Sequence, residues 1–208
     1  MAGGVLTVEG IVLTRALSAG GFDRLAVLTQ ERGLVHVMRR VATSSKAGTV
    51  PDLFDSASLV LTERRADAFF LSEYTLVRRR TGIGARYGLL AAASKWAGFV
   101  AANAGELETT QKLCEISTKL LDALEEGTAP GTALFKALFL FAKSEGLPVR
   151  GEWLAGLSAA GRETAERLLS TPLGEIAGDG DAEGGAFAES VLRWMCGFHD
   201  ILPPRMEE

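Results

Sequence analysis

The 208-residue sequence contains few of the residues that build metal sites and disulfide frameworks. It has only two cysteines, Cys114 and Cys196, and only two histidines, His36 and His199. Two distant cysteines exclude both a disulfide framework and a four-cysteine metal site. Cys196 and His199 share one face of a predicted helix, but two ligands fall short of a structural zinc site. We therefore expect reduced, packed thiols, no bound metal and no cofactor.

Long apolar runs are also missing. No stretch of about 18 residues is both apolar and uncharged, so no membrane-spanning helix is expected. Met1–Leu17 contains Glu9 and Arg15 where a secretory signal peptide needs its apolar region. With 47% hydrophobic residues and a mean hydropathy of +0.16, the chain still has enough apolar side chains to fold. We expect a soluble, cytoplasmic protein, associated with the nucleoid if it acts on DNA.

Recognisable catalytic motifs are absent as well. No serine, cysteine or carboxylate lies in a G-x-S-x-G or H-E-x-x-H context. Gly82-Ile83-Gly84 resembles the start of a dinucleotide-binding fingerprint, but Tyr87 occupies the place of its third glycine. We predict a hinge and a helix start there instead. No catalytic residue is assigned, and the chain is expected not to be an enzyme.

Charge is distributed unevenly along the chain. Residues 1–80 contain eleven Lys and Arg against eight Asp and Glu, whereas residues 81–208 contain eleven against eighteen. The formal net charge of −4 therefore combines a first part of +3 with a second part of −7. This division indicates two domains, and a basic domain favours a nucleic-acid partner.

The first 80 residues have the pattern of β-strands. Apolar alternation and turn residues predict five strands without an intervening helix, at residues 8–15, 24–29, 34–41, 58–63 and 69–77. Both alternating sets in 8–15 are partly apolar, which predicts a strand covered on both faces at one end. Gly10 would permit that strand to bend. Five such strands favour a small Greek-key barrel of the OB type.

Helical spacing of apolar residues begins after residue 82. It predicts helices over 89–100, 107–124 and 134–143, shorter ones over 153–157 and 162–169, and a closing helix over 187–201. The segment 134–143 is apolar around most of its circumference and should be the central helix. Ala177–Gly185 is expected to be a flexible acidic loop. The predicted fold class is α+β, with an OB-fold barrel at 1–80 and an all-α domain at 81–208.

Clustered basic residues in the barrel half are the first candidate site. They follow the third strand and the last strand: Arg39, Arg40, Lys46, Arg78, Arg79 and Arg80. On an OB barrel, such side chains would neutralise DNA phosphates and release counterions. The alternative is an ordinary solvated charged surface.

Aromatic residues that could stack on bases are scarce in the same half. The candidates are Phe54, Phe69, Phe70 and Tyr74. The core needs at least half of them, so contacts to the DNA backbone should outweigh contacts to bases.

Lysines spaced seven apart define a second candidate site in the helical half. Lys112 and Lys119 share one face of a predicted helix, and Lys136 and Lys143 share a face of the next. Either pair could line an apolar groove that takes an acidic peptide with an apolar anchor. The alternative is two ordinary solvated helix faces.

The order and spacing of these segments resemble the bacterial RecO family of recombination mediators, over most of the chain. Individually the segments are of low specificity. They are V-E-G-I-V-L-T-R (Val8–Arg15), F-D-R-L-A-V-L-T-Q-E-R-G-L-V (Phe22–Val35), L-F-D-S-A-S-L-V-L (Leu53–Leu61), F-L-S-E-Y-T-L-V-R (Phe70–Arg78) and L-F-K-A-L-F-L-F-A-K-S-E-G-L-P (Leu134–Pro148).

This resemblance implies a function in DNA repair after DNA damage. It implies an OB-fold that binds single- and double-stranded DNA, and a helical domain that binds the acidic C-terminal tail of single-stranded-DNA-binding protein. It also implies partnership with RecR in loading RecA, together with strand annealing. The sequence departs from the family in two respects. Arg150–Leu169 lacks the four-cysteine zinc module of many members, and the basic segment after the third strand is short.

A protein-interaction adaptor is the alternative function. In that case the OB-fold is only a scaffold and does not bind DNA, as the acidic net charge and the few aromatics of the barrel half suggest. The arrangement of the arginines distinguishes the two, since DNA binding requires several of them on one barrel face.

Overall fold

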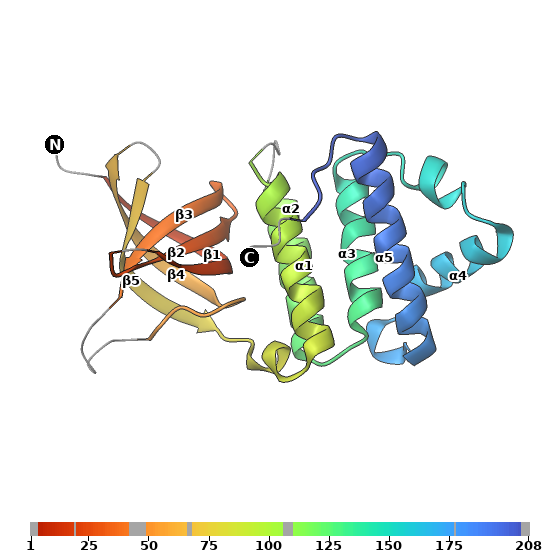
Figure 1. Cartoon of the computed structure of the whole chain (residues 1–208), viewed down its shortest axis with the longest axis horizontal. Helices are drawn as coiled ribbons and strands as arrows, with labels where there is room; N and C mark the ends of the chain where they lie inside the picture. Colours follow the sequence, from red (N-terminus) through yellow and green to blue (C-terminus); the bar gives the residue numbers. More distant parts are fainter. Residues whose placement is uncertain are drawn as a thin grey trace. The chain divides into compact units, whose positions relative to one another are not determined.

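The computed structural model describes residues 4–18, 20–41, 49–65, 68–105, 110–176 and 178–204. Lys46 of the predicted DNA site lies outside these ranges. The chain divides into two units (Figure 1). The first holds the described parts of residues 1–80 and 104–114, and the second holds those of 81–103 and 115–208. No helix in the described ranges has the length and apolar character of a membrane span.

Five strands form the barrel of the first unit: β1 (Val5–Ser18), β2 (Phe22–Thr29), β3 (Gly33–Arg40), β4 (Ser56–Arg65) and β5 (Ala68–Arg78). The sheet closes on itself in the order β1-β2-β3-β5-β4, because β1 pairs with both β2 and β4. The pairing of β3 with β5 is parallel and the others are antiparallel. This closed five-stranded ring confirms the predicted OB-type barrel.

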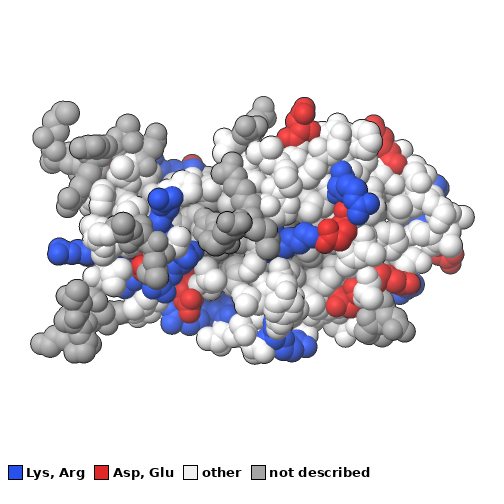
Figure 2. Space-filling view, in the orientation of Figure 1, with Lys and Arg blue, Asp and Glu red and all other residues white. Residues whose placement is uncertain are grey.

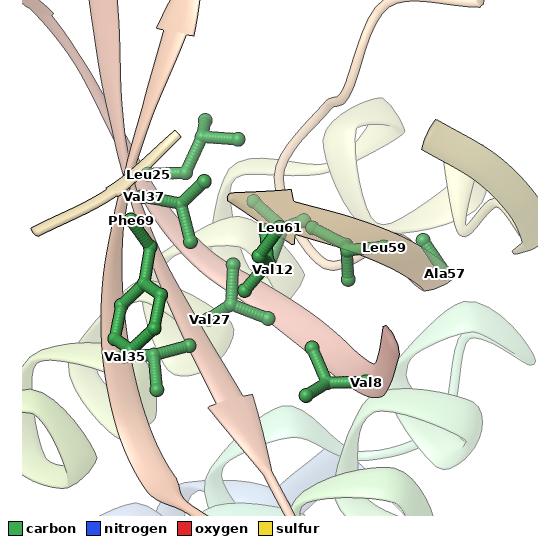
Figure 3. Close-up of a cluster of buried hydrophobic side chains, with 10 residues drawn as sticks. All are labelled: Val8, Val12, Leu25, Val27, Val35, Val37, Ala57, Leu59, Leu61 and Phe69. Atoms are coloured by element: carbon green, nitrogen blue, oxygen red, sulfur yellow. The ribbon is translucent and has the colours of Figure 1, made fainter. Parts of the chain in front are cut away.

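Alternate side chains of each strand point into the barrel and form its core (Figure 3). The core residues are apolar and buried: Val8, Val12, Leu25, Val27, Val35, Val37, Ala57, Leu59, Leu61 and Phe69. On β1, Ile11 and Leu13 alternate with this set and are also buried. The predicted burial of both faces of this strand is therefore confirmed.

Gly10 permits a close approach of β1 and β2. A Cβ atom added at Gly10 would lie 2.6 Å from Val27 Cγ1 and 2.8 Å from the Leu28 carbonyl oxygen. The change of direction itself occurs slightly later, where the β1–β2 register shifts between Val12 and Thr14. This bulge bends the long strand so that it pairs with two neighbours.

The second unit is helical. Its elements are η1 (Thr81–Ala85), α1 (Tyr87–Asn103), α2 (Gln111–Glu125, whose first residues group with the barrel), α3 (Pro130–Ser144), η2 (Arg150–Leu154), α4 (Ala159–Ser170), η3 (Leu173–Glu175) and α5 (Gly178–Phe198). α3 packs against α1 and, along most of its length, against α5 (Figure 1). Phe135, Leu138 and Phe141 on α3 are almost completely buried. These contacts agree with the predicted central position of this segment.

The predicted flexible loop at Ala177–Gly185 is wrong, because Gly178–Gly185 forms the first turns of α5. The Thr132 backbone N–H donates to Asp181 Oδ1 at 3.0 Å, and Thr132 Oγ1 donates to the Gly180 carbonyl at 3.0 Å. A Cβ at Gly184 would lie 2.6 Å from Thr132 Cα. The glycines therefore let α5 lie directly against the start of α3, and this packing outweighs their low helix propensity.

Replacing Gly184 with alanine should destabilise the helical unit. The added methyl group would overlap the backbone of Thr132, with a cost of about 1–3 kcal/mol. Urea unfolding followed by tryptophan fluorescence measures this effect, because Trp96, Trp153 and Trp194 all lie in the helical unit.

Gly185→Ala is the matched control in the same helix turn. A Cβ at Gly185 would meet only Gly131 Cα, at an ordinary 3.9 Å. The control should therefore leave the unfolding free energy unchanged or slightly raised. Equal unfolding curves for the two variants would contradict close packing at Gly184.

Candidate nucleic-acid interface

The carboxylate of Asp23 is completely buried and is neutralised by two arginines. Arg15 Nη2 and Arg39 Nη1 lie 3.1 Å and 2.9 Å from Asp23 Oδ2. Arg39 pairs with Asp23 across β2 and β3, and its side chain is only 13% exposed. Arg39 therefore contributes to the barrel itself rather than to an open basic surface.

Asp55 is a second buried carboxylate with several hydrogen-bond donors. Arg79 donates to both of its oxygens, from Nε at 3.0 Å and from Nη2 at 2.7 Å. The Tyr74 hydroxyl donates to Oδ2 at 2.7 Å and the Asp52 amide at 2.9 Å. Burial acts to raise the pKa of Asp55, but the bonds from Arg79, Tyr74 and Asp52 outweigh it and hold that pKa below its usual value.

Four arginines gather around the segment 50–56 that leads into β4. Arg79 Nη2 donates to the Val50 carbonyl at 2.7 Å, and Arg15 Nη1 to the Pro51 carbonyl at 3.4 Å. Arg80 is 4% exposed and donates to the Phe54 carbonyl at 2.6 Å. Arg39 joins this group through the Asp23 carboxylate that it shares with Arg15. The structure thus brings three of the predicted DNA-binding residues together, but in bonds that support the fold.

The other two described members of the predicted site, Arg40 and Arg78, are exposed. The β3–β5 register pairs Val37 with Phe69 and Met38 with Phe70, so Arg40 aligns with position 72. Arg78 lies six residues further along β5, on the order of 20 Å away for an extended strand. Arg40 and Arg78 therefore belong to separate parts of the barrel surface.

The outer face of β2 and β3 carries basic and aromatic side chains. Its positions alternate with the core residues and form cross-strand pairs: Phe22 with Arg40, Arg24 with Met38, Ala26 with His36 and Leu28 with Leu34. Arg24, His36 and Arg40 are exposed. The structure describes all eight of these positions, and none of them is acidic. We name the exposed end of this face, formed by Phe22, Arg24, Met38, Arg40 and the adjoining Phe70, the β2–β3 surface.

An aromatic pair lies on the β2–β3 surface. The rings of Phe22 and Phe70 meet edge to face, with centroids 6.1 Å apart and planes at 79°. Both residues are half-buried, whereas Phe54 and Phe69 are buried and Tyr74 is bonded to Asp55. Phe70 is thus the predicted stacking candidate that reaches the outer surface.

Sequence reasoning missed Phe22 and Arg24. The signal was the strand alternation: Asp23 and Leu25 face inward, so residues 22 and 24 face outward. Detecting it required knowing that β2 begins at Phe22, two residues before the predicted start.

In the space-filling view, Lys and Arg side chains are prominent over the barrel, and side chains of both signs appear over the barrel and over the helices (Figure 2).

The predicted lysine pairs of the helical unit differ in environment. Lys112 and Lys119 on α2 are both exposed, as is Lys143 on α3. Lys136 is half-buried and its Nζ donates to the Thr171 carbonyl. Burial also lowers the pKa of Lys136. Lys136 therefore ties α3 to the segment after α4, while Lys143 remains available on the surface.

A hollow beside α4 was not expected from the sequence. Its volume is about 440 Å³ and its lining consists of Arg150, Glu166, Arg167, Leu169 and Ser170. The Arg150 guanidinium lies 5.7 Å from the centroid of the Phe139 ring, and Arg167 pairs with Glu183 at 3.0 Å. The lining also contains Glu166, and Arg167 already has a carboxylate partner, so Arg150 beside Leu169 is the group best placed for an acidic ligand with an apolar part.

The two thiols lie apart in the chain. Burial raises the pKa of the Cys114 thiol to about 11, and it also raises that of Cys196. Such thiols are poor nucleophiles and poor metal ligands at neutral pH. Within the described ranges, no three His, Cys, Asp or Glu side chains are grouped so as to hold a metal ion.

Comparison of the chain with protein-family models and with curated proteins found no match.

Replacing Asp55 with asparagine should destabilise the barrel by about 1.5–3 kcal/mol at pH 7, because the charge-assisted hydrogen bonds from the partly exposed Arg79 would be lost. The pKa of Asp55 is lower in the folded state than in the unfolded state. The stabilisation is therefore present above about pH 4 and is lost as the pH falls through the folded-state pKa. The difference in unfolding free energy between the variant and the parent protein should decrease as the pH falls through this range.

Hydrogen exchange of barrel amides measures this effect, because the barrel contains no tryptophan. Asp52→Asn is the control, since the Asp52 side chain is exposed. If the barrel amides are equally protected from exchange in the Asp55→Asn and Asp52→Asn variants at pH 7, the buried carboxylate does not stabilise the barrel.

Proposed function

We propose that this protein is a non-enzymatic, DNA-binding recombination mediator that resembles the RecO family. The observation that carries the proposal is the β2–β3 surface, where Arg24 and Arg40 are exposed and no outward position of either strand is acidic. In five-stranded barrels of this type, the face of strands 2 and 3 between the β1–β2 and β4–β5 turns binds oligonucleotides. Its charge is complementary to a phosphate backbone.

The exposed arginines of the β2–β3 surface and the arginines that bond to buried carboxylates would have different roles. Arg24 and Arg40 would neutralise phosphates and release counterions, which favours binding without strong sequence preference. Arg39 and Arg79 would hold the surface in shape through Asp23 and Asp55. In this proposal the protein brings strands together and breaks no covalent bond.

The helical unit would bind a protein partner. We assign to the hollow beside α4 the acidic C-terminal tail of single-stranded-DNA-binding protein. Support comes from Arg150, which could pair with a carboxylate, and from Leu169, which offers an apolar contact. Partnership with RecR and assistance in loading RecA belong to the same proposal and rest on the family resemblance.

Replacing Arg24 and Arg40 together with alanine should weaken binding to all oligonucleotides alike. The plot of log K against log salt concentration should lose about 0.7 of its slope per phosphate contact on single strands. Affinity at low salt should fall roughly 10-fold. Anisotropy of a labelled single-stranded oligonucleotide, titrated at several salt concentrations, measures both quantities.

Lys143→Ala with Arg193→Ala is the matched control, because it removes two exposed cations from the helical unit. It should leave affinity and slope unchanged. An identical salt slope for the Arg24/Arg40 variant and the parent protein would overturn the proposed surface. Arg79 and Arg80 stay in place in this test, since their bonds support the barrel.

An immobilised peptide that copies the acidic tail should capture the protein, and free DNA should not displace it. Arg150→Glu should weaken this capture roughly 10-fold, which corresponds to about 1.4 kcal/mol. Arg193→Glu, on the exposed side of α5, is the control and should bind as the parent does. Undiminished capture of Arg150→Glu would move the peptide site away from the hollow.

A protein-interaction adaptor is the second candidate. It is favoured by the bonds of Arg39, Arg79 and Arg80 to barrel residues, which engage the guanidinium groups of three predicted DNA-binding residues. The salt titration separates the two functions, because an adaptor would show no salt-dependent affinity for DNA.

A further inference from the structure

The aromatic pair on the β2–β3 surface lies outside the buried core cluster of the barrel. The barrel interior is filled by ten apolar residues, among which Phe69 is the aromatic one, and by partly buried side chains packed against them. Phe22 and Phe70 belong to neither group and face outward beside exposed arginines. Large aromatic side chains that remain partly exposed beside cations often indicate a ligand.

The strand register fixes what surrounds the two rings. Phe22 is paired with Arg40 on β3, and Met38 on β3 is paired with both Arg24 and Phe70. Since β3 lies between β2 and β5, the two rings contact each other across it. The result is a platform of two rings and a thioether, with a guanidinium group on Arg24 and another on Arg40.

From this arrangement we infer that the Phe22–Phe70 pair is a stacking platform for unpaired bases and makes the β2–β3 surface selective for single strands. The inference rests on the proposed function. A base in single-stranded nucleic acid can turn its ring face onto an aromatic side chain, whereas the bases of a duplex are stacked on each other. Arg24 and Arg40 would hold the phosphates on either side of the stacked base.

A stacking platform would also bind nucleic acid without strong preference for its base sequence. Every base has a ring face, so stacking requires no particular hydrogen-bonding pattern. The surface therefore suits unpaired nucleotides of mixed sequence.

Replacing Phe22 and Phe70 with leucine tests the inference, because leucine keeps an apolar side chain at each position and removes the ring. Affinity of the full chain for a single-stranded oligonucleotide should fall about 5-fold or more, since stacking is worth about 1–3 kcal/mol per base. Affinity for a duplex of the same length should change less than about 2-fold, because its phosphate contacts remain. Anisotropy at one fixed salt concentration measures both.

Phe198→Leu is the matched control, as Phe198 is a 77% exposed aromatic residue on α5. It should leave both affinities unchanged, and thermal melting should show the barrel variants to be folded. A selective loss of single-strand affinity in the Phe22/Phe70 variant supports the platform. Equal losses for both nucleic acids, or no loss for either, overturn it.

The Arg24→Ala/Arg40→Ala variant distinguishes failure of the stacking inference from failure of the proposed DNA-binding function. If it loses affinity while Phe22→Leu/Phe70→Leu does not, the surface binds nucleic acid without stacking. If the parent protein binds neither oligonucleotide, the proposed function fails and the platform fails with it.

Discussion

Neutralisation of two buried carboxylates by arginine is the interaction on which the barrel depends. Asp23 and Asp55 are both completely buried, and an unpaired buried charge would cost several kcal/mol. Arg15 and Arg39 neutralise the first, and Arg79 neutralises the second with bidentate geometry. Arg15 and Arg79 also donate to the carbonyls of Pro51 and Val50, so these two ion pairs help to fix the connection into β4.

This requirement divides the basic residues of the barrel into two classes. Arg39 and Arg40 are neighbours in sequence, yet the pleat of β3 sends Arg39 to a buried carboxylate and Arg40 to solvent. The guanidinium groups of Arg39 and Arg79 are engaged by buried carboxylates, so the outward class is better placed to meet a ligand. Counting the basic residues of a strand therefore overestimates the charge that a phosphate backbone would contact. The residues that point outward determine the chemistry of the surface.

Close backbone approach shapes both units. Because Gly10 has no side chain, Val27 can pack against it in the barrel. In the same way, the backbone of Thr132 packs against Gly184 in the helical unit. The glycine-rich start of α5 has the composition of a loop, but its glycines serve contact rather than flexibility. Composition alone does not distinguish these uses, because both require the absence of a side chain.

The sequence by itself determined the five strands, the change to helices after residue 80 and the apolar α3, because side-chain periodicity is a local property of the chain. It also indicated that the barrel half is basic. Only the tertiary structure decided which arginines meet Asp23 and Asp55, that α5 begins at Gly178, and that Phe22 and Phe70 meet across β3. These outcomes depend on strand register and helix contact between residues far apart in sequence, which periodicity does not encode.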